Sequence, residues 1–539
     1  MRVNLAGFNV ESDLLRPLNK ARRQAFTPET IAAAYARISR SDRSVEELRQ
    51  EAREELEKAR KSNLTIVFEM GHHSVAEHAV FNFDVVGISR LAAEALERHR
   101  LNSYTEKSQR YVSSDDQFVV PVEVSGSDCA DEFLTIVRAQ NSYYHELYAK
   151  LVNYFQAKHP EWRDDPTRIE NRAKEDARYI LSLATATQLG LTANARNLEL
   201  MLRSLAADDL GEVRSLAEEF YEQVMTVAPS LIIFQQPTDY ERNTYPRLRD
   251  YGQTFMVSAF PRRPKNFIAL SASDVSLVDY TPNADNKLLA AMMHTVSRAS
   301  YAECLGRVER QTLARKKEIL KLACQDLQSY DAVLREFEHL YLTFELVISA
   351  SCFAQLKRHR LMTITAQPYN PNHGWTIPVS VGEIKEHKNF KEMLARSEEA
   401  FDRVAAISPA AAQYVLTNSH QRRVLVTVNA REVYHLGRLR EDAAAQWDIR
   451  DIATRMIDQA RHVMPLTLTL ASGKDSYPKT YEELFGKPPA VVKLEMPKPR
   501  PIPVEAPNSK PPAAGRKAKT MGRLTIMPTE QRRPVQGAE

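Results

Sequence analysis

The chain has 539 residues, of which 43% are hydrophobic and 26% are charged, a length that corresponds to several domains of about 150 residues each. The formal net charge is +4, but residues 486–539 alone contain 11 basic and 4 acidic residues, so residues 1–485 are slightly acidic. A folded part without net positive charge argues against a nucleic-acid-binding scaffold, and we expect no nucleic-acid partner.

The sequence also lacks the signals of glycine-loop nucleotide-binding proteins, membrane proteins and cysteine-rich metal-binding proteins. Neither GxGxxG nor GxxxxGK[ST] occurs, which excludes nucleotide binding through a glycine-rich loop. No run of 18 uncharged apolar residues occurs, and residues 1–13 carry charges instead of a signal core, so we expect no membrane association. The four cysteines lie far apart and form no metal pair, which fits a reducing, cytoplasmic location.

Three elements are predicted in the first half of the chain. Residues 44–61 have the pattern of a charged amphipathic helix. Alternating apolar and polar residues over 80–85 predict a strand, and apolar residues at helical spacing over 88–96 predict a helix after it. The segment Arg98-His99-Arg100 then lies at the C-terminal end of that helix.

The same order of motifs occurs twice. The first half contains Glu-His, an alternating strand, Arg-His-Arg and Asn-Ala-Arg, at residues 77–78, 80–85, 98–100 and 194–196. The second half repeats them at residues 338–339, 342–346, 358–360 and 429–431, and residues 424–428 form a predicted strand before the last motif. This is a duplication and not a solenoid, because one connection has shortened while the order is kept.

We therefore predict two mixed α/β (α+β) domains, at residues 1–240 and 281–485, joined by a linker at 241–280. Residues 486–539 contain 11 of the 28 prolines and no aromatic residue. Such a composition cannot bury enough apolar surface to offset the entropy of folding, and it predicts a disordered Pro-rich tail.

The densest functional signal lies at residues 98–110, which contain three arginines, one histidine and two serines. Guanidinium groups match phosphate oxygens two at a time, so this segment is suited to bind a phosphate. The alternative is a solvated helix end, where cations favour the helix dipole. The second Arg-His-Arg, after a matching helix, favours the phosphate site.

A second segment, residues 71–78, contains three histidines and one glutamate, a composition that could indicate a metal site. The second copy keeps only Glu338-His339, and the spacing is not HExxH, so we predict no metal. Ser351 and Cys352 have no base at a recognisable spacing, which gives a nucleophile triad no support.

The motifs resemble those of the flavin-dependent thymidylate synthases, or ThyX family. The shared signals are GHHSVAEH, the specific RHR-x7-S pattern from Arg98 to Ser108, and Asn-Ala-Arg. The resemblance covers residues 1–240 and, in degraded form, about 280–480. It implies an α/β homotetramer that binds FAD and dUMP, uses methylenetetrahydrofolate and NADPH, and assembles each active site from several subunits.

The two copies depart from the family pattern in complementary ways. The first keeps four residues, Glu106, Ser108, Arg110 and Arg178, where the second has Ala366, Pro368, Asn370 and Gln413. The second keeps Gln355, His435 and Arg440, where the first has Ala95, Leu200 and Leu205. We infer an internal pseudo-dimer with one composite site and one inactive reciprocal site, so that a homodimer of this chain would equal the family's tetramer.

The resemblance implies roles for fifteen residues. The FAD ligands would be His72, Ser74, Arg98, His99, Arg100, Glu106, Asn429, Arg431 and His435. The dUMP ligands would be Ser108, Arg110, Arg178, Gln355, Arg358 and Arg440. Arg440 is the catalytic candidate, because a permanent cation can stabilise negative charge on the uracil ring.

The predicted function is reductive methylation of dUMP to dTMP. The alternative is a non-catalytic descendant that binds flavin or nucleotide and has a regulatory or structural role, which Pro368 and Leu205 favour. RNA binding through the tail has little support, because the tail has no aromatic residues for base stacking.

Overall fold

The computed structural model describes residues 1–10, 27–38, 41–256 and 274–490. Nearly all of the predicted Pro-rich tail, and part of the predicted linker, lie outside these residues. Within the described part of the chain, no helix is long and apolar enough to cross a membrane.

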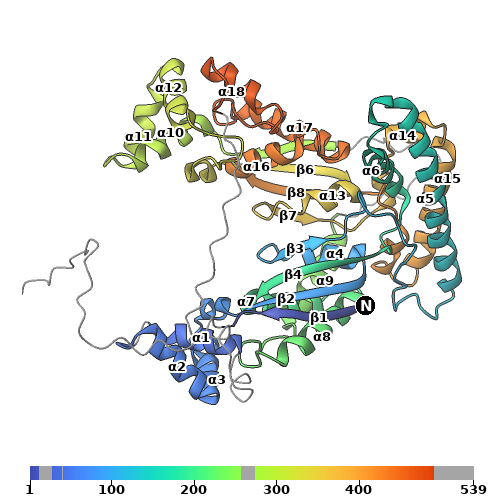
Figure 1. Cartoon of the computed structure of the whole chain (residues 1–539), viewed down its shortest axis with the longest axis horizontal. Coiled ribbons are helices and arrows are strands. Elements are labelled where there is room, and N and C mark those ends of the chain that lie inside the picture. Colours follow the sequence, from blue (N-terminus) through green and yellow to red (C-terminus); the bar gives the residue numbers. More distant parts are fainter. Residues whose placement is uncertain (11–26, 39–40, 257–273, 491–539) are drawn as a thin grey trace, which may run out of the picture. The chain divides into compact units, whose positions relative to one another are not determined.

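Two four-stranded antiparallel sheets have the same strand order (Figure 1). The first has the order β1-β2-β4-β3, formed by β1 (Arg2–Phe8), β2 (Val80–Ser89), β4 (Ala186–Asn194) and β3 (Ser103–Glu106). The second has the order β5-β6-β8-β7, formed by β5 (Asp274–Tyr280), β6 (Tyr341–Ser349), β8 (Gln421–Asn429) and β7 (Thr363–Ala366). The predicted duplication is therefore present in the fold.

The helices also correspond between the two halves. The first half has α1 (Pro28–Arg37), α2 (Val45–Glu54), α3 (Leu56–Asn63), α4 (Arg90–Glu97), α5 (Ala130–Lys158), α6 (Pro166–Ala177), α7 (Ala195–Ala206), α8 (Gly211–Met225) and α9 (Asp239–Gln253). The second has α10 (Ala284–Thr295), α11 (Tyr301–Glu309), α12 (Leu313–Cys324), α13 (Ala350–Leu356), α14 (Val379–Glu383), α15 (His387–Ala405), α16 (Ala430–Arg440), α17 (Trp447–Val463) and α18 (Tyr477–Phe485). Helices α4, α7 and α8 pack on the first sheet, as α13, α16 and α17 do on the second. We call β1 to α8 the first repeat and β5 to α17 the second repeat.

Two details differ from the sequence predictions. The helix predicted over 44–61 is two helices, α2 and α3, because Glu55 has φ −121° and ψ 60°, outside the helical region. The second sheet begins inside the predicted linker, since β5 pairs with β6 from Asp274 onward.

The strand and helix that precede each Arg-His-Arg form as predicted, except that β2 extends to Ser89 and so includes Ile88, which the sequence placed in the helix. In β2, Phe81, Phe83 and Val85 are buried, while the polar residues between them face solvent. Ser89 then starts α4, because its side chain accepts a hydrogen bond from the amide of Ala92, and Ser349 starts α13 in the same way. Each Arg-His-Arg follows its helix at the C-terminal end.

In each repeat, the Asn-Ala-Arg motif contacts the Glu-His motif through an ion pair. Asn194 and Asn429 cap α7 and α16, since each side chain accepts a hydrogen bond from the amide three residues on. The neighbouring arginine then forms an ion pair with the glutamate, Arg196 with Glu77 and Arg431 with Glu338. The paired motifs therefore fix the helix to the segment before the central strand.

The two repeats are related by an approximate two-fold axis. Ser182 lies opposite Thr417 in an isolated antiparallel bridge between the repeats. The backbone bonds beside it are Leu183 N to Leu416 O (2.8 Å) and Asn418 N to Leu181 O (2.9 Å). A contact in which equivalent positions of two units exchange bonds is the mark of an isologous dimer interface.

Buried side chains repeat this symmetry. The Tyr179 hydroxyl donates to Asp448 Oδ2 (2.9 Å) in the other repeat, and the equivalent Tyr414 hydroxyl donates to Glu212 Oε2 (2.6 Å). One hydrophobic core also runs across the boundary, from Tyr144 in α5 to residues of the second repeat such as Phe390 in α15. The repeats therefore form an internal pseudo-dimer with a shared core.

Candidate functional site

Arginines of both repeats converge next to the pseudo-two-fold interface. From the first repeat, Arg110 follows β3 and Arg178 follows α6; from the second, Arg358 follows α13 and Arg440 ends α16. Arg110 reaches across the interface, where its Nη2 donates to the carbonyl oxygen of Ala444 (3.1 Å). Arg440 Nη2 donates to the carbonyl oxygen of Gln355 (3.1 Å).

These cations are close enough to perturb one another. Burial lowers the pKa of the Arg440 guanidinium to about 10, and the neighbouring Arg358 and Arg110 act in the same direction. Burial also lowers the pKa of Arg178, helped by Arg110 and Arg90. Among the described residues, no group accepts a hydrogen bond from Arg178 Nη2, although this atom is buried. An anionic ligand would satisfy this donor and relieve the repulsion.

Two buried carboxylates hold the first-repeat side of the cluster. Glu175 lies 2.6 Å from Arg110 Nε. Glu106, a predicted FAD ligand, forms a buried ion pair with Arg90 and lies 3.7 Å from Arg358 Nη2. Burial would raise the pKa of the Glu106 carboxyl. Arg90, together with Lys357 and Arg358 of the second repeat, instead holds this pKa below its ordinary value. Glu106 therefore neutralises and orients arginines in this structure.

The loop after β3 is anchored to the second repeat. Ser108 Oγ accepts a hydrogen bond from the amide of Arg110 (3.2 Å), which shapes the turn. Asn418 of the second repeat donates through Nδ2 to Gln109 Oε1 (3.1 Å) and to the carbonyl oxygen of Arg178 (2.9 Å). The predicted ligands Ser108, Arg110 and Arg178 thus belong to one cross-repeat network.

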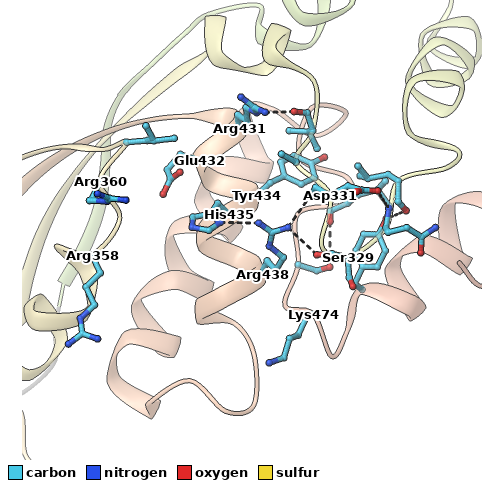
Figure 2. A pocket seen from close by; sticks show the side chains of 18 of the residues that line it. Ser329, Asp331, Arg358, Arg360, Arg431, Glu432, Tyr434, His435, Arg438 and Lys474 are labelled. Carbon is cyan, nitrogen blue, oxygen red and sulfur yellow. Dashed lines mark hydrogen bonds between the residues drawn. The ribbon is translucent and has the colours of Figure 1, made fainter. Parts of the chain in front are cut away.

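A cavity of about 630 Å³ has Arg358 of the cluster among its lining residues (Figure 2). Three predicted FAD ligands, Arg100, Arg431 and His435, line it, and so does the predicted dUMP ligand Arg358. The lining residues for which the sequence predicted no role include Arg360, Glu432, Tyr434, Arg438, Lys474 and Tyr477. Arg360 could have been found as the second copy of Arg100, whereas Lys474 has no local signal.

Six of the nine predicted FAD ligands do not line this cavity. His72 and Ser74 are exposed in the first repeat; in the second repeat Val333, at the position of His72, lines the cavity, whereas Arg335, at the position of Ser74, does not. Arg98 pairs with Asp208 at the surface, with Nη2 3.4 Å from Oδ2. Glu106 pairs with Arg90, as described above. Partial burial of His99 lowers its pKa to about 4, and Asn429 caps α16.

Comparison with known proteins gives the family. The family model described as thymidylate synthase complementing protein matches residues 24–230 and again residues 276–466, which together exceed half of the chain. The chain belongs to this family, known as ThyX. The two matches coincide with the two repeats, so each repeat is a ThyX-like domain.

Individual similar proteins match from about 40% to about three quarters of the chain. A flavin-dependent thymidylate synthase of Clostridium tetani is 33% identical over 213 residues, which are 39% of this chain and 83% of that protein. A UPF0159 protein of Chlamydia muridarum is 27% identical over 437 residues, 76% of this chain and 79% of that protein. A solved UMP/dUMP methylase from Streptomyces cacaoi, bound with 5-Br dUMP, matches 38% of this chain and 97% of its own, with 18% identity and a TM-score of 0.29.

The reciprocal position of this ThyX pseudo-dimer is filled by side chains. The Tyr369 hydroxyl donates to Glu94 Oε1 (2.8 Å), and Arg422 Nη1 donates to Glu94 Oε2 (2.9 Å). All three side chains are buried or nearly so. The equivalent positions on the other side of the axis hold smaller or neutral residues, namely Ala354, Gln109 and Thr187. The symmetry is therefore broken at these positions, which hold a buried ion pair on one side of the axis and uncharged residues on the other.

One group of side chains, two of which line the cavity, has the composition of a metal site. Potential ligand atoms of His359, Glu432 and His435 lie within 4.8 Å of one another. However, Arg440 donates to His359 Nε2 (3.0 Å), and Arg438 Nη2 lies 3.0 Å from His435 Nδ1. Guanidinium groups at both imidazoles disfavour a cation here, and we assign no metal to this group.

Proposed function

We propose that this ThyX protein is an FAD-dependent thymidylate synthase, which methylates dUMP to dTMP at one composite site between its repeats. The observation that carries the proposal is the convergence of Arg110 and Arg178 from one repeat with Arg358 and Arg440 from the other. Neither repeat supplies this set alone, and the reciprocal position is filled by Glu94, Tyr369 and Arg422.

The cluster has the chemistry that a nucleoside monophosphate needs. We assign the phosphate to Arg178, whose Nη2 has no partner among the described residues, together with Arg110 and Ser108. We assign the uracil ring to Arg440, with Gln355 and Arg358 beside it. Since its pKa of about 10 keeps Arg440 cationic at neutral pH, its guanidinium can stabilise negative charge that develops on the ring.

The cavity fits a flavin. Its volume of about 630 Å³ lies within the range of small-molecule sites, which is about 300–1,000 Å³. Arginines at its wall, including Arg100, Arg431 and Arg438, suit a diphosphate, while Tyr434 and Tyr477 offer apolar surface for the rings. When bound, the flavin supplies the redox chemistry by which a methylene group becomes a methyl group, with methylenetetrahydrofolate as carbon donor and NADPH as reductant.

Rescue of a thymidine-requiring host tests the catalytic function. We expect the wild-type gene to restore growth without thymidine, and we expect Arg440→Ala and Ser108→Ala each to impair rescue. Pro368→Ser is the control, because it alters the filled reciprocal side and is expected to rescue like wild type. Soluble wild-type protein that binds dUMP and flavin but does not rescue would favour the non-catalytic alternative.

Colour tests the cofactor. We expect the purified protein to be yellow and Arg431→Ala to lose the flavin. Arg196→Ala is the matched control, since Arg196 occupies the same position of the first repeat and makes the same ion pair, with Glu77. Equal loss from both variants would contradict a single flavin cavity.

We further propose a cytoplasmic homodimer, equivalent to a tetramer of single-repeat subunits, which sedimentation of the holoprotein would test.

A further inference from the structure

Three side chains of the second repeat form a hydrogen-bonded chain that ends at Arg440. Glu432 Oε1 lies 2.9 Å from His359 Nδ1, and Arg440 Nε lies 3.0 Å from His359 Nε2. Glu432 and His359 are almost fully buried, with side chains 3% and 1% exposed. Arg440 uses Nη2 for the Gln355 carbonyl, so its Nη1 is engaged in neither bond.

The chemistry of the three groups fixes where the protons are. A guanidinium can only donate, so His359 Nε2 must carry a lone pair. The imidazole is then neutral, with its proton on Nδ1, and this N–H donates to the Glu432 carboxylate. Burial lowers the pKa of His359, and Arg440 and His435 add to this effect while Glu432 opposes it, so the neutral form prevails at neutral pH.

The first repeat has the same histidine without the rest of the chain. His99 stands where His359 does, but Asn197 occupies the Glu432 position and Leu205 the Arg440 position. Within the described residues, His99 Nε2 has no hydrogen-bond partner. The carboxylate is therefore present in the repeat that has the arginine and absent from the repeat that lacks it.

We propose that Glu432 is a positioning residue for Arg440, acting through the tautomer of His359. The carboxylate selects the imidazole form whose Nε2 can accept from Arg440, and this bond orients the guanidinium with one donor group free for the substrate. The inference rests on the proposed function, because it takes Arg440 as a ligand of dUMP. Loss of the carboxylate lets His359 place its proton on Nε2, which removes the acceptor that holds Arg440.

The test is a double-mutant cycle on the full-length protein, with dUMP affinity measured by calorimetry. We expect Glu432→Gln to weaken dUMP binding about tenfold, the scale of one hydrogen bond to a charged group. In the Arg440→Ala background we expect Glu432→Gln to have no further effect, because the residue acts through Arg440. Asn197→Ala, at the matched position of the first repeat, is expected to leave dUMP affinity unchanged.

A merely structural role would give a different pattern, in which Glu432→Gln weakens binding by the same factor with and without Arg440. That additivity, or wild-type affinity in the single variant, would overturn the proposal. If Glu432→Gln does not fold, Glu432→Asp withdraws the carboxylate by one methylene and should weaken binding about threefold, and unchanged affinity would likewise overturn the proposal. Because the readout is binding, a wild type that binds dUMP without turnover would contradict the proposed function and still test this inference.

Discussion

Lys357 Nζ lies 2.6 Å from Glu97 Oε2, and both side chains are only 6% exposed. Each residue immediately precedes the Arg-His-Arg of its own repeat, so the two occupy equivalent positions that meet across the pseudo-two-fold axis. In a symmetric dimer the same residue would face itself there. Opposite charges at one equivalent position show that each repeat has become specific for the other.

Restoring the symmetry should therefore destabilise the fold. We expect Lys357→Glu to lower the free energy of unfolding by about 3–5 kcal/mol, since it leaves two carboxylates buried against each other. Thermal and denaturant unfolding would measure the loss. The reversed pair, Glu97→Lys with Lys357→Glu, should recover most of it, and a single variant as stable as wild type would show that this contact is not formed.

A second prediction concerns stoichiometry. We expect one dUMP per chain, because Glu94, Tyr369 and Arg422 fill the reciprocal position. Calorimetric titration of the full-length protein measures the number of sites, and two equivalent sites would refute the broken symmetry.

Glu94→Ala is the companion variant. It leaves the nearly buried Arg422 without its carboxylate, so we expect it to lower the unfolding temperature by several degrees, the scale of a broken buried pair. The dUMP affinity of the remaining site should not change, since Glu94 lies on the filled side.

The sequence predicted the elements whose signals are local. The alternation around Phe81 and Phe83 gave the central strand, and the complementary losses in the two copies pointed to a site shared by Arg110 and Arg440. The structure does bring those two arginines close together. The assignment of ligands to them stays a prediction.

What the sequence missed depends on contacts between distant segments. Nothing near Glu175 indicates that it holds Arg110, and Lys474 reaches the cavity only because the chain after α17 folds back over α16. Nothing near Glu106 indicates that it forms a buried ion pair with Arg90 of α4, and its assignment to the cofactor stays a prediction. Such partners are set by tertiary packing, which local patterns do not encode.

The pH dependence of stability has one predictable contribution from Glu441. Burial raises the pKa of this carboxyl from 4.5 to about 7. A raised folded-state pKa means that the folded protein binds the proton more tightly, so stability falls as the pH rises from about 4.5 through about 7. Glu441→Gln removes this loss of stability. We expect the free energy of unfolding of the variant, relative to wild type, to grow by about 1 kcal/mol between pH 5 and 8, a value reduced because Glu441 is partly exposed.

Denaturant unfolding at a series of pH values would measure this effect. Glu218→Gln, which changes an exposed carboxylate on α8, is the control and should follow the wild-type curve. A constant difference between Glu441→Gln and wild type across this pH range would contradict the raised pKa.

The last prediction is that Arg178→Gln weakens binding but stabilises the free protein. Arg178 is 5% exposed, and its buried Nη2 has no hydrogen-bond partner among the described residues. Gln413 is its counterpart in the second repeat, where its Oε1 accepts from the amide of Tyr369 (2.9 Å). Removing a buried cation that has one unsatisfied donor should raise the unfolding temperature without ligand. The dUMP affinity should fall about 30- to 100-fold, because a charged phosphate contact is lost.

Thermal unfolding with and without dUMP measures both effects at once. The variant should have a higher unfolding temperature without ligand, which we call the baseline, and a smaller rise of that temperature when dUMP is added. Gln413→Ala is the matched control with the opposite pattern. It should lower the baseline, because the Tyr369 amide loses its acceptor, and keep the full dUMP shift. If Arg178→Gln lowered the baseline and kept the full shift, Arg178 would be a structural residue and the phosphate would lie elsewhere.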